Sequence, residues 1–171
     1  MKLRKTLFTI VTLLFVTAMT AQNMPEAQKN LQRFDGKWKS NDIKLTIGDK
    51  TYTGTFWFNG TSVLDGTAIY GEEGFDSDEL GSSRGLDMMS YDPSQGIIHW
   101  YVIDNHGTCH DHKGFWTDKD HFYAQYQGVV DGKMYLEKIY FEFVNDKKVD
   151  YHMTGELNGE VSKTMTGTFK K

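Results

Sequence analysis

From Phe34 to the end of the chain, short segments that alternate apolar and polar residues are separated by turn signals at nearly regular spacing. The turn signals are pairs such as Gly48-Asp49, Asp131-Gly132 and Asn158-Gly159. Gly, Asn and Asp favour tight turns because they adopt backbone conformations that other residues avoid. Connections this short join antiparallel neighbours. The pattern therefore predicts an all-β chain of about ten sequential strands, without the helices that an α/β fold requires.

We expect residues 34–171 to form one domain, a single up-and-down antiparallel β-barrel of about 8–10 strands. A β-sandwich is the alternative, but short sequential hairpins favour the barrel because closing the sheet removes its edge strands. Residues 22–33 form an N-terminal segment before the barrel. Within it, residues 23–33 are predicted to form a short helix that covers one end of the fold. The acidic Gly/Ser stretch 71–83 is expected to be a loop.

Residues 1–21 have the layout of a secretory signal peptide. A basic start precedes an apolar run from Leu7 to Val16, and the small residues Ala18 and Ala21 suit a cleavage site. The apolar run is too short to cross a membrane comfortably as a helix. We therefore expect export to the periplasm or the cell exterior, with no membrane span.

The charge and cysteine content of the mature chain narrow its class of partner. Cleavage would remove three basic residues and no acidic one, which moves the formal net charge from -4 to -7. An acidic domain is a poor match for nucleic acid or for an anionic lipid surface. Cys109 is the only cysteine, so no disulfide forms within the chain and the core alone must stabilise it.

An acidic residue interrupts the apolar face of the predicted strand 134–144. Tyr135, Ile139 and Phe141 share this face by alternation, and Glu137 lies among them. A carboxylate in that position either reaches water at the mouth of a barrel or lines a cavity. The candidate cavity wall, which would equally fill an ordinary core, is Trp38, Trp57, Trp100, Tyr135, Glu137, Phe141 and Tyr151.

Residues 97–112 hold four of the six histidines. Read as a hairpin with a two-residue or a four-residue turn, this stretch places His99, His110 and His112 on one face. The opposite face, which includes Trp100 and Cys109, is the more apolar one. We therefore expect the histidine face to point to solvent and Cys109 to be buried.

The histidine face supports a metal hypothesis beside the simpler one of surface decoration. Two imidazoles from one strand and one from its partner can hold Zn²⁺ or Cu²⁺. A metal-dependent enzyme could use His99, His110 and His112 as ligands and Glu137 as the acid or base. If the histidines line the cavity instead, the metal hypothesis is strengthened, and haem is a further candidate. The leading prediction contains no cofactor.

The chain resembles an uncharacterised lipocalin-like (calycin-like) family of exported bacterial proteins. The segments that carry the likeness are Phe34-Asp35-Gly36-Lys37-Trp38, residues 85–93, Trp100 to Asp104, residues 113–118, and residues 158–168. The resemblance implies a barrel with an interior that holds a small molecule. True lipocalins share Gly-x-Trp near the start and place an Arg from a late strand over that Trp. Here Lys170 and Lys171 end the last strand instead.

These observations lead to three hypotheses for function. The first is non-enzymatic binding of a small apolar or amphipathic molecule inside the barrel. The second is a metal- or haem-binding protein or metal-dependent enzyme that uses the histidine face. The third is an interaction role at the cell envelope without a ligand.

Overall fold

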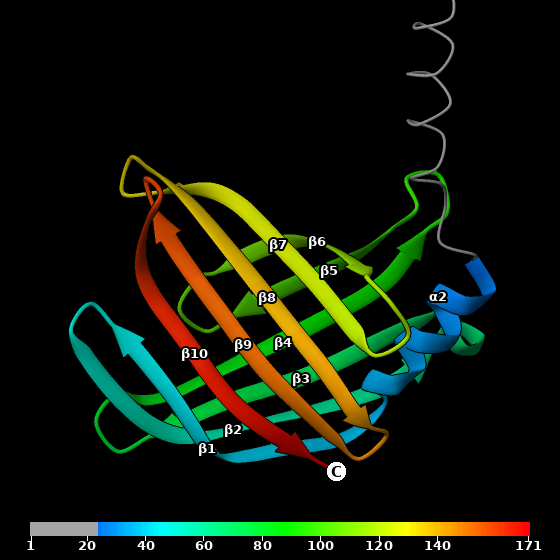
Figure 1. Cartoon of the computed structure of the whole chain (residues 1–171), viewed down its shortest axis with the longest axis horizontal. Helices are drawn as coiled ribbons and strands as arrows, with labels where there is room; N and C mark the ends of the chain where they lie inside the picture. Colours follow the sequence, from blue (N-terminus) through cyan, green and yellow to red (C-terminus); the bar gives the residue numbers. More distant parts are fainter. Residues whose placement is uncertain (1–23) are drawn as a thin grey trace, which may run out of the picture.

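The structure is a computed structural model that describes residues 24–171, so the predicted signal peptide lies outside the described part. Ten antiparallel strands form one closed barrel, preceded by a short helix (Figure 1). The elements are α2 (Met24–Leu31), η1 (Gln32–Phe34), β1 (Gly36–Ile47), β2 (Lys50–Val63), η2 (Leu64–Gly66), β3 (Ala68–Ser77), β4 (Gly81–Asp92), β5 (Ile97–Asp104), β6 (Cys109–Trp116), β7 (His121–Val130), β8 (Lys133–Asn145), β9 (Lys148–Leu157) and β10 (Glu160–Lys170). Within residues 24–171, no helix has the length and apolar character needed to span a membrane.

The barrel closes because the first strand pairs with the last. Leu45 of β1 lies opposite Met165 of β10, and every other strand pairs with its neighbour in sequence. No strand edge is then left open among the ten strands, which is the advantage of closure over a sandwich. The predicted up-and-down barrel and the short N-terminal helix are both confirmed.

The two ends of the barrel differ in how the chain crosses them. At the end we call the mouth, on the left in Figure 1, the chain crosses in five hairpin turns. They include Asp131-Gly132 and Asn158-Gly159, whose positive φ angles are those that tight two-residue hairpins require. At the opposite end, which we call the closed end, α2 and η1 pack against the barrel.

Aromatic rings fill the closed end. The Phe34 ring packs edge-on against Phe122, Phe141 and Phe143, with ring centroids 5.2–5.4 Å apart. Trp38 donates its indole N–H to the Phe34 carbonyl oxygen at 3.3 Å. Edge-to-face contacts between aromatic rings add to the free energy gained from burying the rings. The closed end is therefore a packed core.

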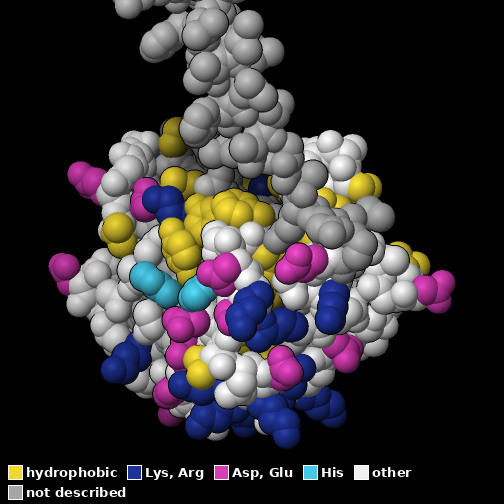
Figure 2. All heavy atoms as spheres, turned by 45° about the vertical axis from the view of Figure 1, so that its right-hand side comes forward, with side chains coloured by type: hydrophobic (Ala, Val, Ile, Leu, Met, Phe, Trp, Pro, Cys, Tyr) yellow, Lys and Arg dark blue, Asp and Glu magenta, His cyan; other side chains and the backbone are white. Residues whose placement is uncertain are grey.

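Cations cover the aromatic rings of the closed end. The Lys171 Nζ atom lies 4.5 Å from the Trp38 ring centroid. The Arg33 guanidinium lies 4.3 Å from the Phe143 ring centroid. Both distances are within the range of cation–π attraction. Figure 2 brings this end forward and shows Lys and Arg side chains gathered in the lower half of the view.

The prediction of a loop over residues 71–83 is wrong. The stretch belongs mostly to β3 and β4, which are joined by a short turn at residues 78–80. Its glycines make room for neighbouring rings. A Cβ at Gly71 would lie 2.4 Å from the Phe58 ring, and one at Gly74 would lie 2.6 Å from the Trp57 ring. Glycine marks close approach here as well as turns.

Candidate functional site

The barrel interior contains a cavity that opens at the mouth. It has a volume of about 400 Å³. Its polar lining includes Glu73, His110, His112, Glu137 and Lys163. A smaller and more apolar pocket of about 50 Å³ lies deeper in the barrel, toward the closed end. The two share four lining residues, which are Phe56, Glu73, Trp100 and Tyr151.

Most of the predicted wall residues do face this interior. Trp38 and Phe141 line the deeper pocket, and Glu137 lines the mouth. Trp100 and Tyr151 lie where the two spaces meet, while Tyr135 is buried beside Glu137.

Trp57 is the exception, since it lies on the outer face of the barrel. Its β2 neighbours Phe56 and Phe58 line the interior, so alternation turns Trp57 outward. There it packs over Gly74, with the Arg84 guanidinium 5.6 Å from its ring centroid. The prediction that Trp57 lines the cavity is therefore wrong.

The predicted facing of the histidines is also wrong, because the hairpin register differs by one residue. His112 lies opposite Trp100, and His110 lies opposite Val102. Directly opposite residues share a face, so His110 and His112 point into the barrel. His99 lies on the outer face, where it contacts Asp111 at 3.0 Å. Cys109 is exposed rather than buried.

The length of the connection explains this difference. Ile103 and Cys109 form the last pair of the hairpin, so five residues, 104–108, separate the two paired residues. The Asp104 side chain accepts hydrogen bonds from the backbone N–H groups of His106 and Thr108, at 2.9 and 2.8 Å. A five-residue connection reverses the parity given by a two- or four-residue turn.

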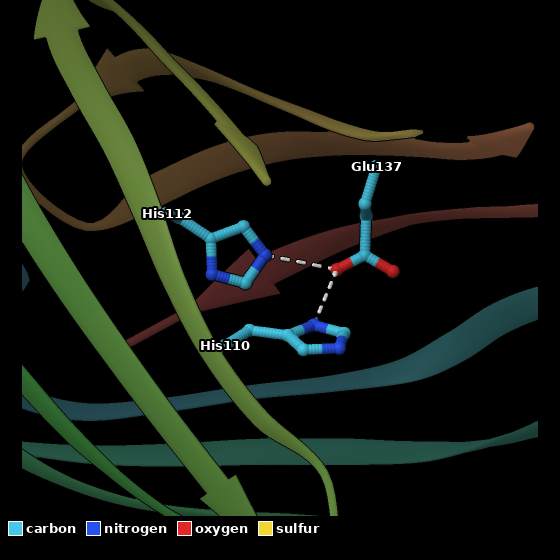
Figure 3. A group of neighbouring side chains, drawn as sticks. All are labelled: His110, His112 and Glu137. Carbon is cyan, nitrogen blue, oxygen red and sulfur yellow. Dashed lines mark hydrogen bonds and ion pairs between the residues drawn. The ribbon is translucent and has the colours of Figure 1, made fainter. Parts of the chain in front are cut away.

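His110, His112 and Glu137 form a cluster inside the mouth (Figure 3). The Nε2 atom of His112 lies 3.0 Å from Glu137 Oε1, and the Nδ1 atom of His110 lies 3.9 Å from the same oxygen. The three side chains come from the inner faces of β6 and β8. His112 is almost fully buried, at 2% exposed, so this is not a solvated surface pair.

The other oxygen of Glu137 is held separately. Tyr135 donates its hydroxyl to Oε2 at 2.5 Å, and the Lys163 ammonium lies 3.2 Å from Oε2. Desolvation alone would raise the pKa of Glu137, but the His112 hydrogen bond and the Lys163 charge outweigh it and hold that pKa well below the usual range. Burial, and then the Glu137 charge, raise the pKa of Tyr135. Glu137 is therefore a carboxylate and Tyr135 a neutral donor.

Burial lowers the pKa of His110, because desolvation disfavours its charged form more than the Glu137 charge favours it. The neutral imidazole also stacks on Tyr126, with ring centroids 3.7 Å apart and an interplanar angle of 12°. This packing fixes the plane of the His110 ring.

Two further carboxyl groups, Glu73 and Asp87, face the interior and were missed from the sequence. Desolvation, and then the neighbouring Asp87 charge, raise the pKa of Glu73 well above its ordinary value. Burial raises the pKa of Asp87 to about 7, although the Trp100 indole N–H donates to it at 2.6 Å. The available signal was the alternation of Ile69, Gly71, Glu73 and Phe75, which the loop prediction obscured.

Comparisons with known proteins support the fold but do not assign the chain to a family. No family model matches the chain, and no curated protein matches it. Among solved structures, the chain is similar to the S-type phycobiliprotein lyase CPES from Guillardia theta. The TM-score is 0.60 at 12% sequence identity, and the match covers 84% of this chain and 91% of that one. The similarity supports the lipocalin-like barrel assignment.

Proposed function

We propose that this barrel binds a small amphipathic molecule in its interior. The observation that carries the proposal is a mouth cavity and a deeper aromatic pocket that share four lining residues. The mouth cavity of about 400 Å³ falls within the roughly 300–1,000 Å³ of small-molecule sites. The apolar body of the ligand would lie between Trp100, Phe56 and Tyr151, where the two spaces meet.

The interior carboxyl groups indicate the polar part of the ligand. Glu73 lines both spaces, and the charges that act on its pKa come from other carboxyls, Asp87 foremost. A buried carboxyl without a compensating cation favours any ligand that supplies one. We therefore infer a ligand with a protonated amine or several N–H donors next to an apolar body.

The structural similarity to a phycobiliprotein lyase shows that the two chains share a barrel fold, and this fold suits the binding of a small molecule in its interior.

The predicted signal peptide favours a ligand that the protein meets outside the cytoplasm. N-terminal sequencing of the protein from its native organism tests that part. A mature chain that begins near residue 22 is expected, and an intact N-terminus would contradict export.

The binding proposal is tested with three probes of equal chain length. Dodecylamine, dodecanol and dodecanoic acid are titrated into the protein, and tryptophan fluorescence is followed. Because Trp38 and Trp100 line the interior, a bound chain changes their emission. We expect dodecylamine to bind 1:1 and about tenfold more tightly than dodecanol, since only the amine pairs with Glu73.

A matched pair of variants on β3 localises the binding. Glu73→Gln removes the interior carboxyl that would ionise beside a bound amine, and Glu72→Gln removes an exposed carboxyl one residue away on the outer face. The first should abolish the preference for the amine over the alcohol, and the second should leave it unchanged. Failure of all three probes to bind, or equal behaviour of the two variants, would contradict the proposal.

A further inference from the structure

The cluster at the mouth contains one more imidazole than a salt bridge to Glu137 would need. Two imidazoles, those of His110 and His112, face one carboxylate oxygen of Glu137, and the nearest nitrogen of each lies within 4 Å of it. One imidazole would be enough to pair with the carboxylate. Two nitrogens and one oxygen are a common ligand set for Zn²⁺.

We propose that His110, His112 and Glu137 form a Zn²⁺ site, with the fourth coordination position open to the cavity. The histidine face considered from the sequence contained His99, which the structure places on the outside. Glu137 takes its place as the third ligand. The proposal does not depend on the identity of the organic ligand.

The distances fit the ion. The candidate ligand atoms of the three residues all lie within 4.8 Å of one another. Atoms bound to tetrahedral Zn²⁺ at about 2.1 Å lie about 3.4 Å apart. Rotation of the two imidazoles and a shift of the ligand atoms by roughly 1 Å would bring all three atoms within bonding distance of one ion. The strand register would not have to change.

The ligands stand on a rigid scaffold. His110 and His112 alternate on the inner face of β6, and Glu137 lies two strands away on β8. The strand between them supplies Tyr126, which stacks on His110. Sites built on strands hold ligand geometry better than sites on loops.

The surroundings of Glu137 orient it for this role. Tyr135 and Lys163 both engage Oε2, which leaves Oε1 directed at the two imidazoles. Outer partners of this kind typically fix metal-binding carboxylates and imidazoles. Lys163 also adds a positive charge nearby, so the carboxylate would be shared by two cations through different oxygens.

An ion here would face the ligand cavity. His110, His112 and Glu137 all line the mouth cavity of about 400 Å³. Three protein ligands leave one tetrahedral position for water or for a donor atom of a bound molecule. Mg²⁺ and Ca²⁺ prefer oxygen ligands, so the two imidazoles favour Zn²⁺ over them.

The test is a titration of the purified, chelator-treated protein with ZnCl₂, with the heat of binding measured by isothermal titration calorimetry. Wild-type protein should bind one Zn²⁺ per chain and no Mg²⁺. His110→Ala and Glu137→Gln should each raise the Kd by about 100-fold or more. Loss of an outer partner of a metal ligand costs about 10–100-fold, and loss of the ligand itself should cost at least the upper value. Co²⁺ substitution should give the visible absorption of a four-coordinate ion in the wild type and lose it in both variants.

His99→Ala is the matched control, since His99 lies beside Asp111 on the outer face of the neighbouring strand. It should leave the Kd unchanged. Near-UV circular dichroism verifies that each variant is folded, and Glu137→Gln preserves side-chain shape if His110→Ala perturbs packing. No Zn²⁺ binding by the wild type, binding retained in both site variants, or an equal loss in His99→Ala would overturn the proposal. Dodecylamine binding by the zinc-free protein is measured separately, so failure of one proposal is distinguished from failure of the other.

Discussion

The closed end and the mouth are made by the same ten strands but use their inner faces differently. At the closed end, Phe34, Trp38 and Phe143 pack edge to face and leave a pocket of only about 50 Å³. At the mouth, ionisable groups such as His112 and Glu137 line a cavity of about 400 Å³. The closed end is built for stability, and the mouth keeps polar groups in partly desolvated positions.

This contrast indicates where each kind of variant should act. Burying aromatic rings contributes free energy of folding, whereas burying carboxyl groups costs free energy unless they are paired. Variants at the closed end should therefore mainly reduce stability, without changing the preference for an amine over an alcohol. Variants among the interior carboxyls should change binding, and some should increase stability.

The largest expected effect is that of Phe34→Ala. The ring is 5% exposed and contacts four other aromatic rings, so its loss should reduce the free energy of unfolding by about 3–5 kcal/mol. Urea unfolding measures this change. Because Phe34 also lines the deeper pocket, the control readout is the preference for dodecylamine over dodecanol, which depends on Glu73. That preference should stay the same in the folded fraction, and its loss would contradict the distinction between the two ends.

Asp87→Asn should have the opposite sign. Burial raises the pKa of Asp87 from 3.8 to about 7, so the folded state holds a proton that the unfolded state releases between these values. The contribution of Asp87 to stability is therefore most favourable at and below about pH 4 and becomes less favourable as the pH rises to about 7. Each pKa unit corresponds to about 1.4 kcal/mol. We expect the Asn variant to be about 2–4 kcal/mol more stable at pH 8 and to lose this pH dependence.

A second aspartate on β4 provides the control for this effect. Hydrogen bonds from Ser94 and Gln95 lower the pKa of the partly exposed Asp92 to about 2. Its contribution is present above pH 4 and is lost as the pH falls toward 2, so Asp92→Asn should not stabilise the protein at pH 8. Equal pH profiles for the two variants would show that interior burial is not the cause.

Lys171→Met should have a smaller effect at the closed end. The Lys171 ammonium lies 4.5 Å from the Trp38 ring centroid, and the residue is exposed. Loss of the cation–π contact should reduce the free energy of unfolding by about 0.5–1 kcal/mol. Lys171→Arg should preserve stability, and thermal unfolding of the two variants side by side tests this contact.

The smallest effect on stability, and the sharpest test of strand register, concerns Cys109. The thiol is exposed on the outer face of β6, while its neighbour His110 faces inward. Iodoacetamide should modify Cys109 in the folded protein without loss of structure. A thiol that reacts only after unfolding would return the hairpin to the register in which His99 and His110 share a face.

The strands and turns could be predicted from sequence because their signals are local. Alternation within β8 placed Glu137 among apolar residues, and Asp131-Gly132 and Asn158-Gly159 marked real turns. Such features depend on neighbours along the chain, which a single sequence displays directly.

The parts of the site that were mispredicted depend on relations between strands. One extra residue in the connection 104–108 exchanges the inner and outer faces of the hairpin, so His99 and His110 separate. Glu73 was overlooked because Gly71 and Gly74, which accommodate the rings of Phe58 and Trp57, resembled turn glycines. Alternation alone does not distinguish a glycine under a ring from a glycine in a turn.

Native mass spectrometry of the protein purified from its native organism shows whether the barrel interior is occupied. We expect one organic adduct per chain, released on unfolding and replaceable by dodecylamine. A bare chain mass that stays unchanged after dodecylamine is added would contradict the binding proposal.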